Sequence, residues 1–84
     1  MAYKIEYKSS VFRELKHLDK NVAKRIAREI RESLSSDPNR GEPLTRQFKC
    51  MLKLRVGDYR IIYSKTKDGV LILRIGHGSI VYEK

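Results

Sequence analysis

Polar and apolar residues alternate between Lys49 and Tyr63, and this is the clearest pattern in the chain. In its first half, K-C-M-L-K-L-R-V, the even positions are apolar and most odd positions are cationic. A period of two is typical of a strand with one buried and one exposed face. Gly57 and Asp58 then suit a two-residue hairpin turn with glycine in the first central position. The segment therefore predicts a β-hairpin.

The register of this hairpin predicts a cationic face. The turn places Arg55 opposite Arg60 and Lys53 opposite Ile62, and cross-strand partners project from the same face of a sheet. Lys53, Arg55 and Arg60 are therefore expected to form one exposed cluster. Directly opposed arginines repel each other, so a sheet that holds such charge together suits an anion such as a phosphate backbone. A solvated basic face without chemistry is the alternative.

The flanking segments predict two helices and two more strands. Tyr3 to Lys8 alternates as a strand does, residues 11–18 and 22–34 carry apolar stripes at helical spacing, and Val70 to Gly76 completes the set. The order β-α-α-β-β-β predicts an α+β fold. We expect an antiparallel helical hairpin on one face of a small, mostly antiparallel four-stranded sheet, all within a single domain, residues 1–84.

The last strand leaves two registers open. A two-residue turn at Asp68-Gly69 places its apolar side chains on the cationic face, whereas a three-residue turn with left-handed Gly69 places them in the core. These side chains are Leu71, Leu73 and Ile75. We predict the second register because it buries more apolar surface, and it moves Arg74 onto the cationic face.

Composition favours a polyanionic partner and a reduced compartment. The 84 residues include 19 Lys and Arg against 10 Asp and Glu, a net charge of +9. Cys50 is the only cysteine, which excludes a disulfide framework and a thiolate metal site, and its inward position predicts a buried side chain. The charged, strand-like N-terminus does not look like a signal peptide, and apolar runs are too short for a membrane span. We expect a cytoplasmic protein without a membrane partner.

Metal-free RNA cleavage is the chemistry that the cationic face can support. No metal-ligand spacing, phosphate-loop motif or Ser/His/Asp arrangement is recognisable, so we expect no cofactor. In RNA the 2′-hydroxyl attacks the adjacent phosphate, which requires removal of one proton, supply of another and neutralisation of developing charge. Arginine stays protonated and suits bidentate phosphate contact. Arg55 and Arg60 are therefore assigned to phosphate, and Lys53 to the role of base or electrostatic stabiliser.

Four further residues are candidates for the same site. Lys49, on the same strand as Lys53, and Arg74, on the last strand, extend the cationic face and are candidate RNA contacts. His77 follows the last strand, where the chain can turn back toward that face. Tyr82 can stack on a base or donate a proton.

Nearly the whole chain resembles RelE-type toxins of the RelE/ParE toxin–antitoxin superfamily. The resemblance rests on P-L-x-x-x-F-K-x-x-L-K-L-R-V-G-D-Y-R-I-I-Y and on the ending I-G-H-x-x-x-V-Y. It implies a toxin, monomeric when free, that enters the ribosomal A site and cuts messenger RNA. It also implies a cognate RelB-like antitoxin that wraps the toxin and covers or displaces its catalytic elements.

The resemblance also assigns roles to single residues. It makes Lys53 the catalytic lysine, Arg60 the phosphate-binding arginine and Tyr82 the tyrosine that stacks on the messenger base. Arg55 matches the strand arginine of the family, and His77 matches the histidine of its G-H-R-R-x-V-Y ending.

The chain departs from that ending. Gly78 and Ser79 stand where the family has arginines, and Met51 stands where some members have a second lysine. One phosphate-stabilising arginine is therefore missing, and such a loss costs about a hundred- to a thousandfold in rate. The chain is then a weakened toxin, an inactive form or a variant that uses Arg74. Two other functions stay open: a ParE-like gyrase inhibitor and a non-catalytic module that binds RNA or the ribosome.

Overall fold

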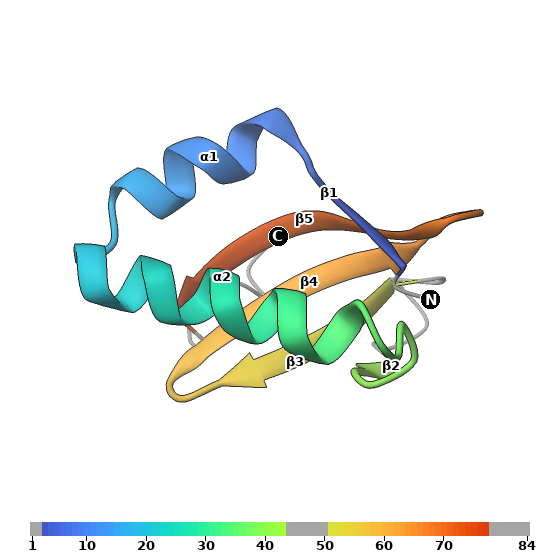
Figure 1. Cartoon of the computed structure of the whole chain (residues 1–84). Coiled ribbons are helices and arrows are strands. Elements are labelled where there is room, and N and C mark those ends of the chain that lie inside the picture. Colours follow the sequence, from blue (N-terminus) through green and yellow to red (C-terminus); the bar gives the residue numbers. More distant parts are fainter. Residues whose placement is uncertain (1–2, 44–50, 78–84) are drawn as a thin grey trace.

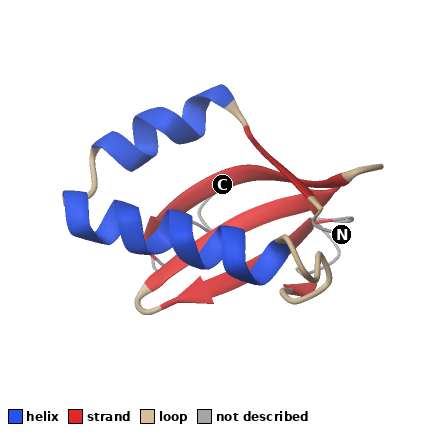
Figure 2. Cartoon of the chain, in the orientation of Figure 1, coloured by secondary structure: helices blue, strands red, loops and turns tan. Residues whose placement is uncertain are grey.

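The structure, a computed structural model, describes residues 3–43 and 51–77 and confirms the α+β fold (Figure 1). Two helices lie over one face of a β-sheet, and no helix within the described residues lies on the opposite face (Figure 2). The chain runs through β1 (Lys4–Tyr7), α1 (Ser9–Lys16), α2 (Lys20–Leu34), β2 (Glu42–Pro43), β3 (Met51–Val56), β4 (Tyr59–Lys65) and β5 (Gly69–His77). The predicted helical hairpin and the four predicted strands are all present.

The sheet has the order β1-β5-β4-β3-β2. The first strand runs parallel to β5, and the other neighbours are antiparallel. The sheet has one strand more than predicted, β2, and this strand lies in the segment that we expected to be a loop. It is only two residues long and pairs Glu42 with Lys53 and Pro43 with Leu52. This short pairing brings the loop after α2 to the edge of β3.

The helices form where the apolar stripes predict them. In α2 the buried residues Ile26, Ile30 and Leu34 recur every four residues, so one face of the helix meets the sheet. Asp19 caps α2 because its carboxylate accepts a hydrogen bond from the Asn21 N–H at 2.8 Å. Among the described residues, no helix is both long enough and apolar enough to cross a membrane.

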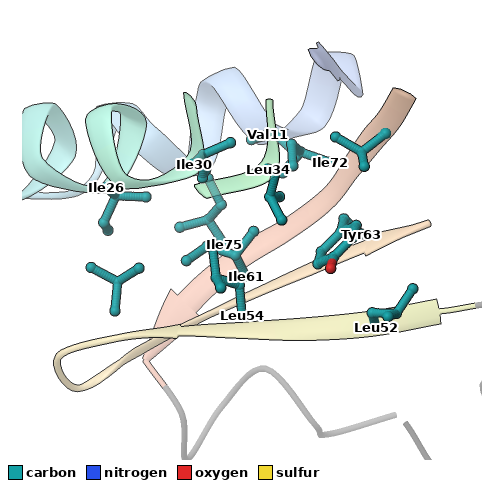
Figure 3. Packing of buried hydrophobic residues seen from close by; sticks show 12 residues of the cluster. Val11, Ile26, Ile30, Leu34, Leu52, Leu54, Ile61, Tyr63, Ile72 and Ile75 are labelled. Carbon is teal, nitrogen blue, oxygen red and sulfur yellow. The ribbon is translucent and has the colours of Figure 1, made fainter. Parts of the chain in front are cut away.

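One hydrophobic core fills the space between the helices and the sheet (Figure 3). Ile26, Ile30 and Leu34 from α2 meet Ile61 and Tyr63 of β4, and all five are fully buried. Each large aliphatic side chain removed from water contributes roughly 1.5–3 kcal/mol. The core therefore holds the inner face of the sheet, and the alternation of each strand fixes which residues remain on the outer face.

The central hairpin has the predicted register. Val56 pairs with Tyr59, Arg55 with Arg60, and Gly57 adopts the positive φ of 59° that its place in the turn requires.

The register of β5 agrees with the prediction over only half of the strand. Arg74 pairs with Ile62, and Ile75 lies in the core, as predicted. The prediction was wrong for Leu71 and Leu73, which are only partly buried, and the fully buried residues at this end are Val70 and Ile72. The register shifts between Ile62 and Tyr63, and the extra residue on β5 is Leu73.

A β-bulge at Leu73 thus lets both halves of β5 direct apolar side chains into the core. The turn is tighter than predicted, because the Thr66 N–H donates to the Gly69 carbonyl at 2.8 Å and the Gly69 N–H donates to Thr66 Oγ1 at 3.0 Å. Because of this tight turn, the pairing of β5 with β4 begins one residue away from the predicted register. The inserted residue restores the phase, so that apolar side chains face the core on both sides of the bulge.

Candidate functional site

A cationic hollow of about 310 Å³ lies at the edge of β3, beside the loop before β2. Its lining residues come from that loop and from the β3–β4 hairpin: Arg40, Gly41, Glu42, Lys53, Leu54, Arg55 and Arg60. Four of them are cationic and one is a carboxylate, so the lining carries a net charge of +3. A concave surface with such charge raises the local concentration of anions. We call this surface the β3 hollow.

Lys53 reaches the β3 hollow because it occupies an outward position of β3. Leu52 and Leu54 on either side of it are buried, whereas 31% of the Lys53 side chain is exposed. Its Nζ lies 3.8 Å from Oε1 of Glu42, the residue directly across the β2–β3 pair. The ammonium group is therefore held at the surface by its strand register and has an exposed carboxylate beside it.

Arg55 and Arg60 line the hollow as a directly opposed pair. Their register was predicted from the turn, and the structure confirms it. Arg55 is exposed, and Arg60 is half-buried and donates from Nη1 to the Tyr59 carbonyl at 3.4 Å. Two guanidinium groups at opposed positions repel each other. An anion that contacts both removes that repulsion and accepts hydrogen bonds from each fork.

Arg74 lies on β5, two strands away from β3, and does not line the β3 hollow. Its Nε is 3.4 Å from Oε2 of Glu14 on α1. The other oxygen of that carboxylate accepts the Ile75 N–H at 2.9 Å, at a level of β5 beyond its pairing with β1. Glu14 therefore satisfies an open sheet edge and holds Arg74 there. The guanidinium that we expected to extend the cationic face has a carboxylate partner.

His77 ends β5 outside the lining of the hollow. It pairs with Tyr59, whose ring packs against the core on the helix side of the sheet. The two rings meet edge to face, with centroids 5.9 Å apart and an interplanar angle of 75°. Because cross-strand partners share a face, the register places the His77 side chain on the opposite face from Lys53 and Arg60.

The other sequence candidates lie outside the described residues. These are Lys49 and Tyr82 among the proposed site residues, together with Cys50, Gly78 and Ser79.

Sequence reasoning missed two residues that line the hollow, Arg40 and Glu42. Both fall in a segment without helical or strand periodicity, and the pairing of β2 with β3 brings them to the site. The one available signal was that this segment is polar and follows a proline that ends the helix.

Comparison with known proteins identifies the family. A family model described as "ParE toxin of type II toxin-antitoxin system, parDE" matches residues 5–82. Comparison with curated protein sequences gives no match.

Solved structures of RelE toxins share the fold. The chain is 28% identical to a chain of the toxin–antitoxin complex RelBE2 from Mycobacterium tuberculosis, with a TM-score of 0.84 and 92% of each chain covered. Isolated RelE toxin from Escherichia coli is 21% identical, with a TM-score of 0.70 and coverage of 90% of this chain and 84% of that one. The archaeal RelE–RelB complex from Pyrococcus horikoshii gives 26% identity, a TM-score of 0.65 and coverage of 96% and 100%.

The fold, the cationic hairpin and the family match agree. Because the family model spans nearly the entire sequence, the chain belongs to the ParE toxin family of type II toxin–antitoxin systems, within the RelE/ParE superfamily, and has the fold of RelE-type toxins.

Proposed function

We propose that this toxin is a ribosome-dependent messenger RNA endonuclease that acts in the A site without a metal. The observation that supports the proposal best is the convergence of Lys53, Arg55 and Arg60 on one hollow. Three cations around one depression suit a phosphodiester in the act of cleavage, because negative charge builds up on its oxygens.

In the proposed reaction the RNA supplies its own nucleophile. The 2′-hydroxyl gives up its proton and attacks the adjacent phosphorus, the bond to the 5′-oxygen breaks, and the leaving oxygen takes up a proton, for which Tyr82 is the candidate donor. Lys53 acts as base or electrostatic stabiliser, and Arg60 and Arg55 bind the phosphate oxygens. Tyr82 stacks on the messenger base. A role for His77 is retained as a prediction that the variant His77→Ala tests.

The remaining expected contacts with RNA are Lys49 and Arg74. Because Glu14 pairs with Arg74 at 3.4 Å, we expect Arg74→Ala to have a smaller effect on cleavage than Arg60→Ala. The phosphate-stabilising arginine that is missing from the segment of Gly78 and Ser79 is expected to lower the rate below that of a complete site.

We propose a RelB-like antitoxin as the partner that inhibits this toxin, and a free toxin that is monomeric and cytoplasmic. Two solved relatives of similar fold, from Mycobacterium tuberculosis and Pyrococcus horikoshii, are themselves toxin–antitoxin complexes.

A gyrase inhibitor is the second candidate, because the family model that matches is that of a ParE toxin. Two assays separate the two functions. The first adds the toxin to reconstituted translation and maps the messenger by primer extension, and the second measures DNA supercoiling by gyrase. Cuts in phase with codons support the nuclease. Intact messenger with inhibited supercoiling supports the gyrase inhibitor, and arrested translation without cuts supports a non-catalytic ribosome-binding module.

A further inference from the structure

The loop that carries Arg40 is fixed to the sheet from both sides. The buried hydroxyl of Tyr63 donates to the Pro38 carbonyl at 2.9 Å and accepts the Gly41 N–H at 2.9 Å. The Arg40 N–H donates to the Asp37 carbonyl at 3.1 Å. The residues before and after Arg40 are therefore both tied to one fully buried side chain of β4.

Gly41 brings this loop into contact with β3. A Cβ atom at this position would lie 2.5 Å from the Lys53 carbonyl oxygen and 2.7 Å from the Tyr63 hydroxyl. Only a residue without a side chain fits there, since contacts of this length do not occur for real Cβ atoms. The backbone next to Arg40 thus touches the residue that we propose as the catalytic lysine, and Arg40 lines the β3 hollow with it.

The charge of Arg40 is available to a ligand. The described residues form ion pairs through Lys4, Lys53 and Arg74, and Arg40 takes part in none of these. Its side chain is exposed. A guanidinium is always protonated and presents a planar fork of donors that matches two phosphate oxygens.

We propose that Arg40 is a third guanidinium of the phosphate site, and that it supplies from the loop before β2 the contact that Gly78 and Ser79 do not provide. The inference rests on the proposed function, since it assigns Arg40 to the same RNA phosphate as Arg55 and Arg60. Tyr63 acts as a positioning residue, because it holds the backbone on both sides of Arg40. The alternative is that Arg40 is a solvated surface arginine.

Binding to an uncut RNA tests this assignment separately from catalysis. The probe is a fluorescent single-stranded RNA with 2′-O-methyl groups throughout, so that the attacking hydroxyl is absent, and its Kd is measured by anisotropy at several salt concentrations. Each phosphate contact on a single strand contributes about −0.7 to the slope of log K against log salt. We expect Arg40→Ala to reduce the slope by about 0.7, as Arg60→Ala does.

Arg13→Ala is the matched control, because it removes the same charge from an exposed position of α1, on the side of the sheet away from the outer face. An unchanged slope for Arg13→Ala with a reduced slope for Arg40→Ala supports the inference. Equal slopes for the two variants, whether both reduced or both unchanged, overturn it.

The rate of messenger cleavage gives a second readout. Arg40→Ala is expected to lower the rate by about a hundredfold and Arg40→Lys by less, because lysine keeps the charge but loses the fork. If the wild-type toxin cuts no messenger, the nuclease proposal fails, and the slopes still decide whether Arg40 belongs to an anion site. If the wild type cuts and Arg40→Ala cuts equally fast, the inference about Arg40 is wrong and the nuclease proposal stands.

Discussion

Replacement of Tyr63 by phenylalanine removes one oxygen atom and, with it, the attachment of the loop before β2. The ring stays in the core, where Tyr63 is fully buried, so no cavity forms. The hydroxyl makes two hydrogen bonds of 2.9 Å, one to the Pro38 carbonyl and one from the Gly41 N–H. A hydrogen bond of this kind contributes about 0.5–1.5 kcal/mol net, and the cost is higher where a partner is left without another.

Tyr63→Phe is therefore expected to lower the free energy of unfolding by about 2 kcal/mol. For a domain of this size each kcal/mol shifts Tm by about 4–8 °C, so Tm should fall by about 8–16 °C. Urea and thermal unfolding followed by circular dichroism measure both quantities. Tyr3→Phe is the control, because 47% of Tyr3 is exposed. A loss below about 0.5 kcal/mol, within the range of ordinary surface substitutions, contradicts the assignment of Tyr63 as the anchor of the loop.

Three further predictions concern pH, the sheet edge and the hollow. Burial raises the pKa of Tyr63, so the unfolded chain loses this proton first, and stability should fall as the pH rises above about 10. Glu14→Ala should lower the free energy of unfolding by about 1–2 kcal/mol, because Glu14 accepts the Ile75 N–H. Glu42→Gln should change stability by less than about 0.5 kcal/mol, because the Glu42 side chain is 79% exposed, and should tighten RNA binding by removing the carboxylate beside Lys53.

Each of these predictions has its own check. The alkaline loss of stability should be smaller in Tyr63→Phe than in the wild type, and equal losses would contradict it. Glu32→Ala removes an exposed carboxylate from α2, and it should be much less destabilising than Glu14→Ala if the sheet edge matters. The prediction for Glu42→Gln is checked by the anisotropy of the fluorescent RNA, and weaker RNA binding by this variant than by the wild type would contradict it.

The parts of the fold that local patterns encode could be predicted from the sequence. Alternation on both sides of Gly57 and Asp58 was enough to fix the pairing of Arg55 with Arg60, because a two-residue turn permits one register. The stripe of α2 likewise predicted the face that meets the sheet. In both cases neighbours in sequence determine the outcome.

The rest depends on contacts that sequence periodicity does not report. The bulge at Leu73 arises from a tight turn and a shared core, so neither uniform register describes β5. Arg74 lies on the predicted face by register but pairs with Glu14, which is 60 residues away in the chain. Arg40 lines the hollow because the β2–β3 pairing and the Tyr63 hydroxyl hold its loop against β3, and a loop without periodicity gave no sign of this.

The rate of messenger cleavage by variants of the β3 hollow, compared with that of a control variant, tests the central claim most directly. The claim is that the β3 hollow binds the phosphate that is cut. The measurement is the rate of codon-phased cutting in reconstituted translation for the wild type, Lys53→Ala, Arg60→Ala and the surface control Arg13→Ala. We predict that Lys53→Ala and Arg60→Ala lose about a hundredfold or more in rate while remaining folded, and that Arg13→Ala does not. Cutting at the wild-type rate by both hollow variants would contradict the account.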